Sequence, residues 1–111
     1  MIDKKVLFIT GAAIGIGHAA CLKFASEGYA IAFNDYNVEN GNKALEELKD
    51  KGYEAIFLPG DATKEEEVKA MVAKTVDTYG RIDTLINNAG GLGGRCDSGH
   101  ERWAYHRAGQ S

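Results

Sequence analysis

The stretch of sequence that decides the fold reads Thr10-Gly11-Ala12-Ala13-Ile14-Gly15-Ile16-Gly17. It begins at the end of an almost continuously apolar run, 4–10, which is typical of a strand buried on both faces of a parallel sheet. Apolar residues then recur at helical spacing as far as Gly28, a residue type that ends helices. The stretch therefore predicts a sharp glycine turn between a buried strand and a helix.

The same alternation of strand and helix continues downstream. The expected elements are the strands 30–34, 54–58 and 84–88 and the helices 38–51 and 64–79. Gly52 and Gly80 follow the two helices directly and are expected to end them. Thr63 and Glu66 have the spacing of a capping box, which predicts how the last helix begins.

This order of elements predicts the fold class. Four apolar strands that alternate with three helices favour an α/β protein with a Rossmann-type parallel sheet, right-handed crossovers and helices on both faces. The expected strand order is 3-2-1-4, which puts the first strand at the centre. Ligands bind such sheets at the carboxyl ends of the strands, beside the point where the strand order reverses. The glycine turn of residues 10–17 is expected to lie there.

Composition narrows the classes of protein. The 111 residues are 44% hydrophobic and 26% charged, which excludes disorder over most of the length. The net charge of -3 argues against a nucleic-acid binder, and no apolar stretch is long enough to span a membrane. Cys21 and Cys96 stand in a sequence rich in lysine and glutamate, so we expect free thiols and a cytoplasmic location.

The character of the sequence changes near residue 91. All lysines precede this point, whereas the tail 92–111 contains no lysine, the only tryptophan and almost no aliphatic residues. We expect a domain at 1–91 that forms the N-terminal half of a larger Rossmann domain, followed by an irregular or disordered tail. A shift of reading frame near Gly94, or foreign sequence joined to a fragment, would produce such a change. The tail's potential metal ligands lack the paired spacing of zinc modules, so no metal site is expected; they are Cys96, Asp97, His100 and His106.

The position of the glycines indicates a ligand. Gly11 allows a sharp turn, and Gly15 and Gly17 remove side chains that would keep a phosphate from the backbone amides at the positive end of the helix. Asp35 ends the second strand, eighteen residues after Gly17, where a carboxylate can bind the hydroxyl groups of an adenosine ribose. The alternative interpretations are a tight packing turn for the glycines and a turn or helix cap for Asp35.

The same carboxylate favours NAD over NADP. A carboxylate at Asp35 would repel the 2′-phosphate of NADP. The neighbouring positions supply no compensating cation: they are Ile14, Asn34, Tyr36 and Asn37. No lysine with a following serine or threonine ends a glycine run, which argues against a Walker-type phosphate loop.

Three motifs together resemble the short-chain dehydrogenase/reductase family over residues 4–91. They are Thr10-Gly11 with Gly15 and Gly17, Asp61 after the third strand, and Asn87-Asn88-Ala89-Gly90, which closes the fourth. The resemblance implies that Asp61 contacts the adenine, and that the last motif supports the sheet and lines a ribose of the cofactor. The alternative is an ordinary turn role for Asp61 and ordinary strand-end hydrogen bonds for Asn87 and Asn88. The cofactor-binding residues it implies are Thr10, Gly11, Ile14, Gly15, Ile16, Gly17, Asp35, Asp61, Ala62, Asn87, Asn88, Ala89 and Gly90.

The catalytic apparatus of that family is missing from this sequence. Members similar to this chain use a tyrosine with a lysine four residues later, and a serine that orients the substrate. No tyrosine here has a lysine at that spacing, so no catalytic residue is assigned and the chain alone is expected to be inactive. The resemblance implies the NAD-binding part of an oxidoreductase for alcohols and carbonyls, such as a 3-oxoacyl thioester, a sugar or a steroid, whose full-length forms are homo-oligomers. The alternative is a non-catalytic nucleotide-binding or regulatory module.

Overall fold

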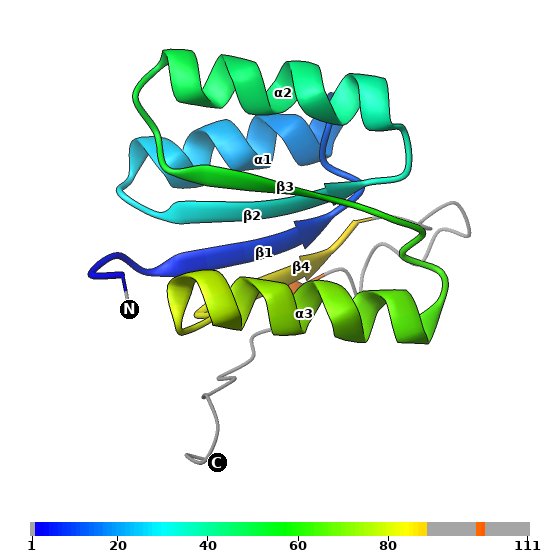
Figure 1. Cartoon of the computed structure of the whole chain (residues 1–111). Coiled ribbons are helices and arrows are strands. Elements are labelled where there is room, and N and C mark those ends of the chain that lie inside the picture. The colour runs from blue at the N-terminus through cyan, green and yellow to red at the C-terminus, as the bar shows by residue number, and fades with distance from the viewer. Residues whose placement is uncertain (1, 89–99, 102–111) are drawn as a thin grey trace.

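The computed structural model describes residues 2–88 and 100–101, and its strands form one sheet in the order β3-β2-β1-β4-β5. The elements are β1 (Val6–Thr10), α1 (Gly15–Ser26), β2 (Ala30–Asp35), α2 (Val38–Asp50), β3 (Ala55–Pro59), α3 (Glu65–Tyr79), β4 (Thr84–Asn87) and β5 (His100–Glu101). The pairs among β1 to β4 are all parallel, which confirms the predicted order 3-2-1-4. The helices α1 and α2 cover one face of the sheet and α3 covers the other (Figure 1).

The central strand is buried because helices cover both faces of the sheet. Each residue from Val6 to Ile9 has no exposed surface. Leu7 and Ile9 pack with buried residues of α1 and α2, whereas Val6 and Phe8 pack with buried residues of α3. Since successive side chains of a strand point to opposite faces, both sets must be apolar, which explains the unbroken apolar run.

The helix ends agree with the glycine pattern, but one helix start does not. Gly28, Gly52 and Gly80 have φ of 95°, 84° and 86°, the left-handed conformation that ends a helix. The predicted capping box of Thr63 and Glu66 is wrong. The helix α3 begins at Glu65 after Lys64, and no side chain caps it.

The physical reason for that correction lies in the turn before α3. The Thr63 backbone N–H and hydroxyl both donate to Oδ1 of Asp61, at 2.9 and 2.6 Å. The Thr63 side chain is therefore engaged with the preceding turn and is not available to the helix. Glu67, and not Glu66, reaches back, and its carboxylate accepts the Asp61 N–H at 2.7 Å.

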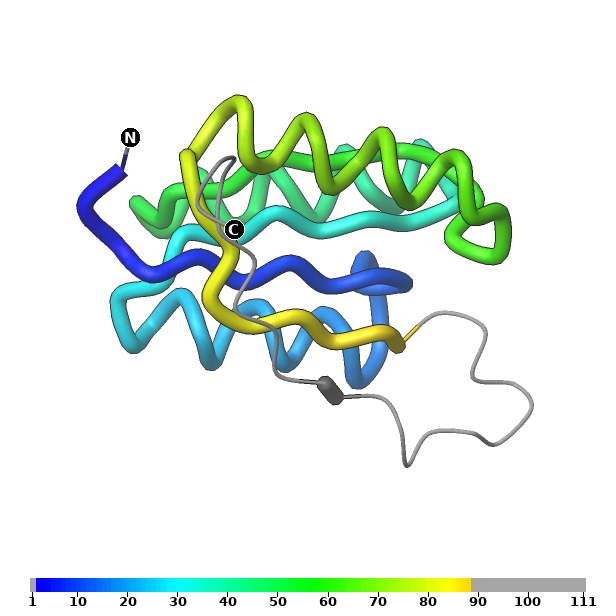
Figure 2. Tube along the Cα trace, turned by 90° about the horizontal axis from the view of Figure 1, so that it is seen from below, coloured from blue at the N-terminus to red at the C-terminus, as the bar shows by residue number. Residues whose placement is uncertain are grey.

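Part of the predicted tail lies outside the described residues, as do Ala89 and Gly90 of the predicted site. Within the tail, β5 pairs antiparallel with β4, an addition to the sheet that the sequence did not predict. The expectation of an irregular tail at 92–111 otherwise stays a prediction. Figure 2 shows the carboxyl ends of β1 and β4 and the turn from β3 into α3 at the same end of the molecule.

Candidate functional site

A cleft of about 360 Å³ opens at the carboxyl end of the sheet. Three loops form it: β1 to α1, β2 to α2, and β3 to α3. The lining residues are Gly11, Asn34, Asp35, Tyr36, Gly60, Asp61, Ala62 and Thr63. The structure thus brings together Gly11, Asp35, Asp61 and Ala62, four of the residues that the sequence predicted for the site, and none of the lining residues is basic.

The glycines of the first loop have two distinct structural roles. Gly11 and Gly15 have φ of 63° and 67°, a conformation that side-chain-bearing residues rarely adopt. Gly17 is needed for packing, because a Cβ there would stand 2.5 Å from the Gly11 carbonyl oxygen and 2.8 Å from Nδ2 of Asn88. The sequence assigned Gly17 to phosphate approach; in the structure the observed constraint is the contact between α1 and the loop.

The start of α1 is open to solvent. Ile14 and Ile16 are 64% and 82% exposed, which is unusual for large apolar side chains. The first turn of α1 carries no acidic residue, and the N-cap residue Ile14 makes no side-chain hydrogen bond. The positive end of the helix is therefore free of any competing negative charge from its own first turn.

Asp35 joins the glycine loop to the start of the next helix. Its Oδ2 accepts the Ala13 N–H at 2.9 Å, and its Oδ1 accepts the Asn37 N–H at 2.9 Å. The turn role that was the alternative interpretation is thus present in the structure. Because each carboxylate oxygen can accept a further hydrogen bond, this role is compatible with binding a hydroxyl group.

Asp61, like Asp35, accepts hydrogen bonds within a turn and also lines the cleft. Both hydrogen bonds from Thr63 go to Oδ1, and together they lower the pKa of the Asp61 carboxyl below its usual value. Asp61 therefore stays ionised under ordinary conditions. Its own backbone N–H is held by Glu67. The turn role proposed as the alternative is observed here too, and among the described side chains no donor engages Oδ2.

Asn87, the last residue of β4, and Asn88 directly after it hold the loop from the other side. The Thr10 hydroxyl donates to Oδ1 of Asn87 at 2.9 Å and accepts the Asn88 N–H at 3.0 Å. Nδ2 of Asn88 donates to the Gly11 carbonyl at 2.9 Å. These contacts fix the glycine loop against β4, as expected for strand-end asparagines. They do not place either asparagine in the cleft, whose lining includes neither.

Five residues around the cleft were not assigned to the site from the sequence. Asn34, Tyr36, Gly60 and Thr63 line it, and Glu67 accepts the backbone N–H of Asp61. Asn34 could not be identified because a single buried asparagine near the end of a strand belongs to no repeating sequence pattern. Tyr36 is 77% exposed, and an exposed aromatic residue beside Asp35 was the one signal that could have identified it.

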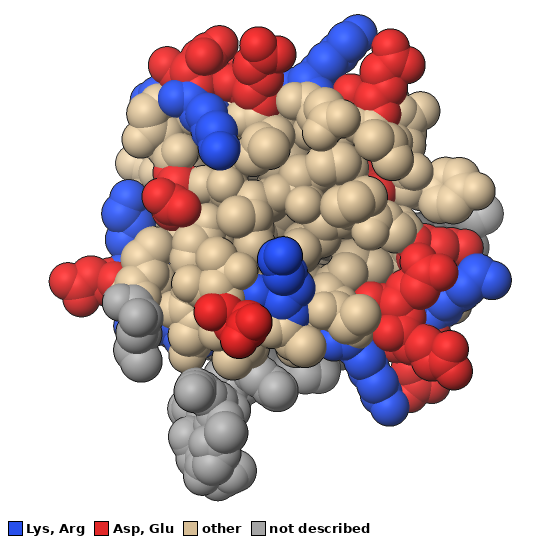
Figure 3. Space-filling model, viewed as in Figure 1, with Lys and Arg blue, Asp and Glu red and all other residues tan. Residues whose placement is uncertain are grey.

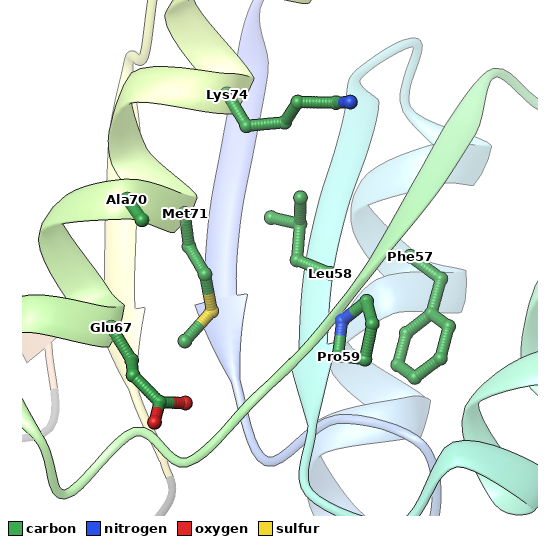
Figure 4. A pocket seen from close by; sticks show the side chains of 7 residues that line it. All are labelled: Phe57, Leu58, Pro59, Glu67, Ala70, Met71 and Lys74. Atoms are coloured by element: carbon green, nitrogen blue, oxygen red, sulfur yellow. The ribbon is translucent and has the colours of Figure 1, made fainter.

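A second hollow of about 310 Å³ lies between β3 and α3, away from the glycine loop. Figure 4 shows Leu58 of β3 and Met71 of α3 on opposite sides of it, with Lys74 and Glu67 at opposite ends. It borders the cleft, since a Cβ at Gly60 would lie 3.1 Å from Glu67 Oε1 and 3.2 Å from Met71 Cε. These two side chains therefore support the Gly60 turn from behind.

Fold and site together define a Rossmann-type α/β protein. Within that class the chain belongs to the short chain dehydrogenase family, whose model matches residues 5–104. The match confirms the resemblance seen in the sequence and extends beyond residue 91.

Relatives and solved structures agree with this assignment. An uncharacterised oxidoreductase of Thermotoga maritima is 48% identical over 86 residues, which cover 78% of this chain and 34% of that protein. NAD⁺-bound xylitol dehydrogenase is 45% identical with a TM-score of 0.74, over 78% of this chain and 33% of the other. L-Sorbose reductase from Gluconobacter frateurii, complexed with NADPH and L-sorbose, is 37% identical with a TM-score of 0.75. The match covers 80% of this chain and 34% of the reductase. The chain spans about a third of the length of these proteins.

Three further features concern the surface charges, the free thiol and the hydrophobicity of the helices. On the face seen in Figure 3, Lys and Arg side chains are interspersed with Asp and Glu, so this face has no single basic patch. Cys21 is a free thiol, and burial raises its pKa to about 12, which makes it a poor nucleophile. Among the described residues, no helix is long and apolar enough to cross a membrane.

Proposed function

We propose that this chain binds the ADP-ribose part of a nicotinamide dinucleotide in the cleft at the carboxyl end of the sheet, and that it prefers NAD to NADP. The observation that carries the proposal is the position of Asp35, which lines the cleft and accepts a hydrogen bond from Ala13 in the glycine loop. A ligand hydroxyl at Asp35 would thus lie next to the loop that receives the phosphates.

The chemical groups around the cleft match those of an ADP-ribose ligand. Gly15 and the exposed start of α1 offer backbone amides and a positive helix end to the pyrophosphate, and Gly11, whose own N–H is held by Asn34, makes the turn that leads to them. Asp35 offers carboxylate oxygens to the ribose hydroxyls. Asp61 and Ala62 lie on the opposite loop, at the place that the family resemblance gives to the adenine.

The preference for NAD follows from charge. Asp35 and Asp61 are the acidic residues of the cleft lining, and no lysine or arginine is among the lining residues. A 2′-phosphate would approach Asp35 without a cation to balance it, and such repulsion is strong where water is partly excluded. The unphosphorylated ribose instead gains hydrogen bonds to a charged acceptor.

We further propose that the whole protein is an oxidoreductase of alcohols or carbonyls, to which the nicotinamide supplies hydride exchange. The similarity to xylitol dehydrogenase and L-sorbose reductase supports sugars or polyols as one substrate class. Acyl thioesters and steroids remain the other classes. The lysine- and glutamate-rich composition supports a cytoplasmic location, and homo-oligomers are expected for full-length family members. A non-catalytic nucleotide-binding module is the second candidate, because no tyrosine has the lysine partner.

Calorimetric titration of the 111-residue chain with ADP-ribose tests the proposal. Asp35→Asn keeps the shape of the side chain but removes its charge, so we expect binding at least about tenfold weaker, the loss of a hydrogen bond to a charged group. The same variant should bind 2′-phospho-ADP-ribose relatively better. Asp77→Asn, on the exposed surface of α3, is the matched control and should bind as the wild type does. Unchanged binding of both nucleotides by Asp35→Asn would contradict the assignment.

A further inference from the structure

Asn34 is a polar side chain in an otherwise apolar stretch of β2, and it is only 1% exposed. Its Nδ2 donates to the carbonyl oxygens of Leu58 and Gly60, at 2.9 and 3.0 Å. Its Oδ1 accepts the Gly11 N–H at 3.3 Å. The orientation of the amide follows from these partners, since carbonyls only accept and a backbone N–H only donates.

These three hydrogen bonds join the two walls of the cleft. Gly11 belongs to the β1–α1 loop and Gly60 to the β3–α3 loop, and both line the cleft with Asn34. The backbone of Asn34 adds another link, because its carbonyl accepts the Ala12 N–H at 2.8 Å. The regular pairing of β1 with β2 ends at Ile9 and Phe33, so these bonds begin where the strand ladder stops.

Both loops turn sharply at this point, and other hydrogen bonds help to hold them: Nδ2 of Asn88 donates to the Gly11 carbonyl, and the Asp35 carbonyl accepts the Gly60 N–H at 3.3 Å. Gly11 and Gly60 have φ of 63° and 154°, and glycine has more backbone freedom than any other residue. A site whose walls are already in place when the ligand arrives loses less entropy on binding. Asn34 is well suited to supply this order, because it is buried and holds a flexible turn on each side.

We propose that Asn34 is a positioning residue that sets the spacing of the glycine loop and the Gly60 turn, and so keeps the cleft in its binding geometry. This inference rests on the proposed nucleotide binding for its effect on affinity. It does not require Asn34 to touch the ligand. Its role is to limit how often the two loops separate, and the apparent affinity of the cleft scales with the fraction of molecules in the competent geometry.

The test compares Asn34→Leu with Thr75→Val in the 111-residue chain. Asn34→Leu keeps the volume but loses all three hydrogen bonds. Thr75 is also fully buried and its hydroxyl donates to the Met71 carbonyl, but it lies on α3 and does not line the cleft. For each variant we would measure ADP-ribose affinity by calorimetry, thermal stability, and hydrogen exchange of the Gly11 amide in the absence of ligand.

We expect Asn34→Leu to weaken ADP-ribose binding at least about tenfold, which corresponds to a competent fraction of about a tenth, and to speed Gly11 exchange by a similar factor. Thr75→Val should lower the stability but leave the ADP-ribose affinity and the rate of Gly11 exchange unchanged. Wild-type affinity and slow Gly11 exchange in Asn34→Leu would overturn the inference, as would an equal loss of affinity in Thr75→Val.

Asn34→Asp provides a second test if the leucine variant does not fold. Its carboxylate still accepts from Gly11 but places negative oxygen against two carbonyls, whereas the protonated acid can donate to one of them. We expect its affinity, relative to the wild type at the same pH, to recover from neutral to mildly acidic pH; no recovery would contradict the inference. If the wild type binds no ADP-ribose but Gly11 exchange still accelerates in the variants, the proposed function fails and the positioning role stands.

Discussion

Gly15 and Gly17 stand two residues apart in the same loop, but the structure constrains them for different reasons. At Gly15 the backbone has φ of 67°, and nothing lies within 4 Å of the point where a Cβ would stand. At Gly17 the backbone is helical, and an added Cβ would meet the Gly11 carbonyl and Ala12 Cα, at 2.5 and 2.8 Å. The first glycine is required by conformation and the second by space.

Substitution by alanine should separate these two requirements. Gly17→Ala forces α1 away from backbone atoms that cannot move cheaply, and we expect it to lower the free energy of unfolding by about 1–3 kcal/mol. Gly15→Ala should cost about 1 kcal/mol through backbone strain alone. Urea denaturation of both variants measures the difference. A smaller loss for Gly17→Ala than for Gly15→Ala would contradict the packing role.

Residues of the site differed in how far the sequence could predict them. Asp35 and Gly11 were found because their type and spacing match a known chemistry, and both line the cleft. Asn34 was missed because its amide works only through three backbone groups that are 23 to 26 residues away in the chain. Hydrogen bonds to distant backbone leave no periodic pattern in a sequence. The role of Gly17 could be recognised only once Asn88 was placed next to it.

At the level of elements, the backbone of α2 lies against an aromatic side chain of β3. Gly41 is buried in α2, and a Cβ there would overlap the ring of Phe57 on β3. That ring in turn stacks on Phe33 of β2, with centroids 5.3 Å apart. The glycine lets the helix backbone approach the aromatic pair, so it fixes how close this helix lies to the edge of the sheet.

A double-mutant cycle should expose this contact. Gly41→Ala alone is expected to destabilise the chain by about 1–3 kcal/mol through overpacking. In the background of Phe57→Leu, which shortens the side chain that the new methyl group would strike, the same change should cost at least about 1 kcal/mol less. Thermal and urea unfolding of the four chains give the coupling. Additive effects would show that Gly41 and Phe57 are not in contact.

Asp83 ties β1 to the turn before β4. Its Oδ2 accepts the Val6 N–H at 2.8 Å, and the Arg81 guanidinium donates to both carboxylate oxygens at 2.8 and 2.9 Å. Partial burial opposes ionisation, but the Arg81 and Val6 hydrogen bonds outweigh it and hold the pKa of Asp83 below its usual value. The charged form of Asp83 therefore contributes to stability.

This contribution has a defined pH dependence. Because the pKa of Asp83 is lower in the folded state than in the unfolded state, its stabilisation is present above about pH 4 and is lost as the pH falls through the folded value. Asp83→Asn should cost about 1–2 kcal/mol at neutral pH and less at low pH. Arg81→Gln should give an intermediate loss. Urea denaturation as a function of pH measures both, and a constant difference between wild type and Asp83→Asn would contradict the assignment.

The elements were largely predictable, and their exceptions have local causes. Apolar runs and glycine stops identified four strands and three helices, because burial on both faces and left-handed helix ends leave direct marks in the sequence. The capping box predicted for α3 was wrong because Asp61 accepts hydrogen bonds from the Thr63 N–H and hydroxyl, the groups that the box would use. The strand β5 could not be predicted, because it pairs through only two residues and lies in a segment whose sequence has no periodic apolar pattern.

At the scale of the whole molecule, the chain holds a candidate nucleotide cleft but not the tyrosine–lysine pair that similar members of the family use. Residues from three loops line this cleft. No tyrosine of the 111-residue sequence is followed four residues later by a lysine. Binding and catalysis are thus expected to be separable in this chain.

The expected result is nucleotide binding without turnover. Incubation of the chain with NADH and a sugar ketone, an acyl thioester or a steroid ketone should leave the nicotinamide absorbance unchanged beyond the buffer control, because the sequence has no tyrosine with a lysine four residues later to donate a proton to the carbonyl. Asp35→Asn serves as the reference for contaminating activity. Turnover that disappears in this variant would contradict the expectation.

The most direct measurement is calorimetric titration of the wild-type chain with ADP-ribose and with 2′-phospho-ADP-ribose under the same conditions. If the cleft binds the adenosine side of NAD through Asp35, ADP-ribose should bind at least about tenfold more tightly, since the phosphorylated ligand meets a carboxylate without a neighbouring cation. Equal binding of the two ligands, tighter binding of the phosphorylated one, or no binding of either would contradict this account.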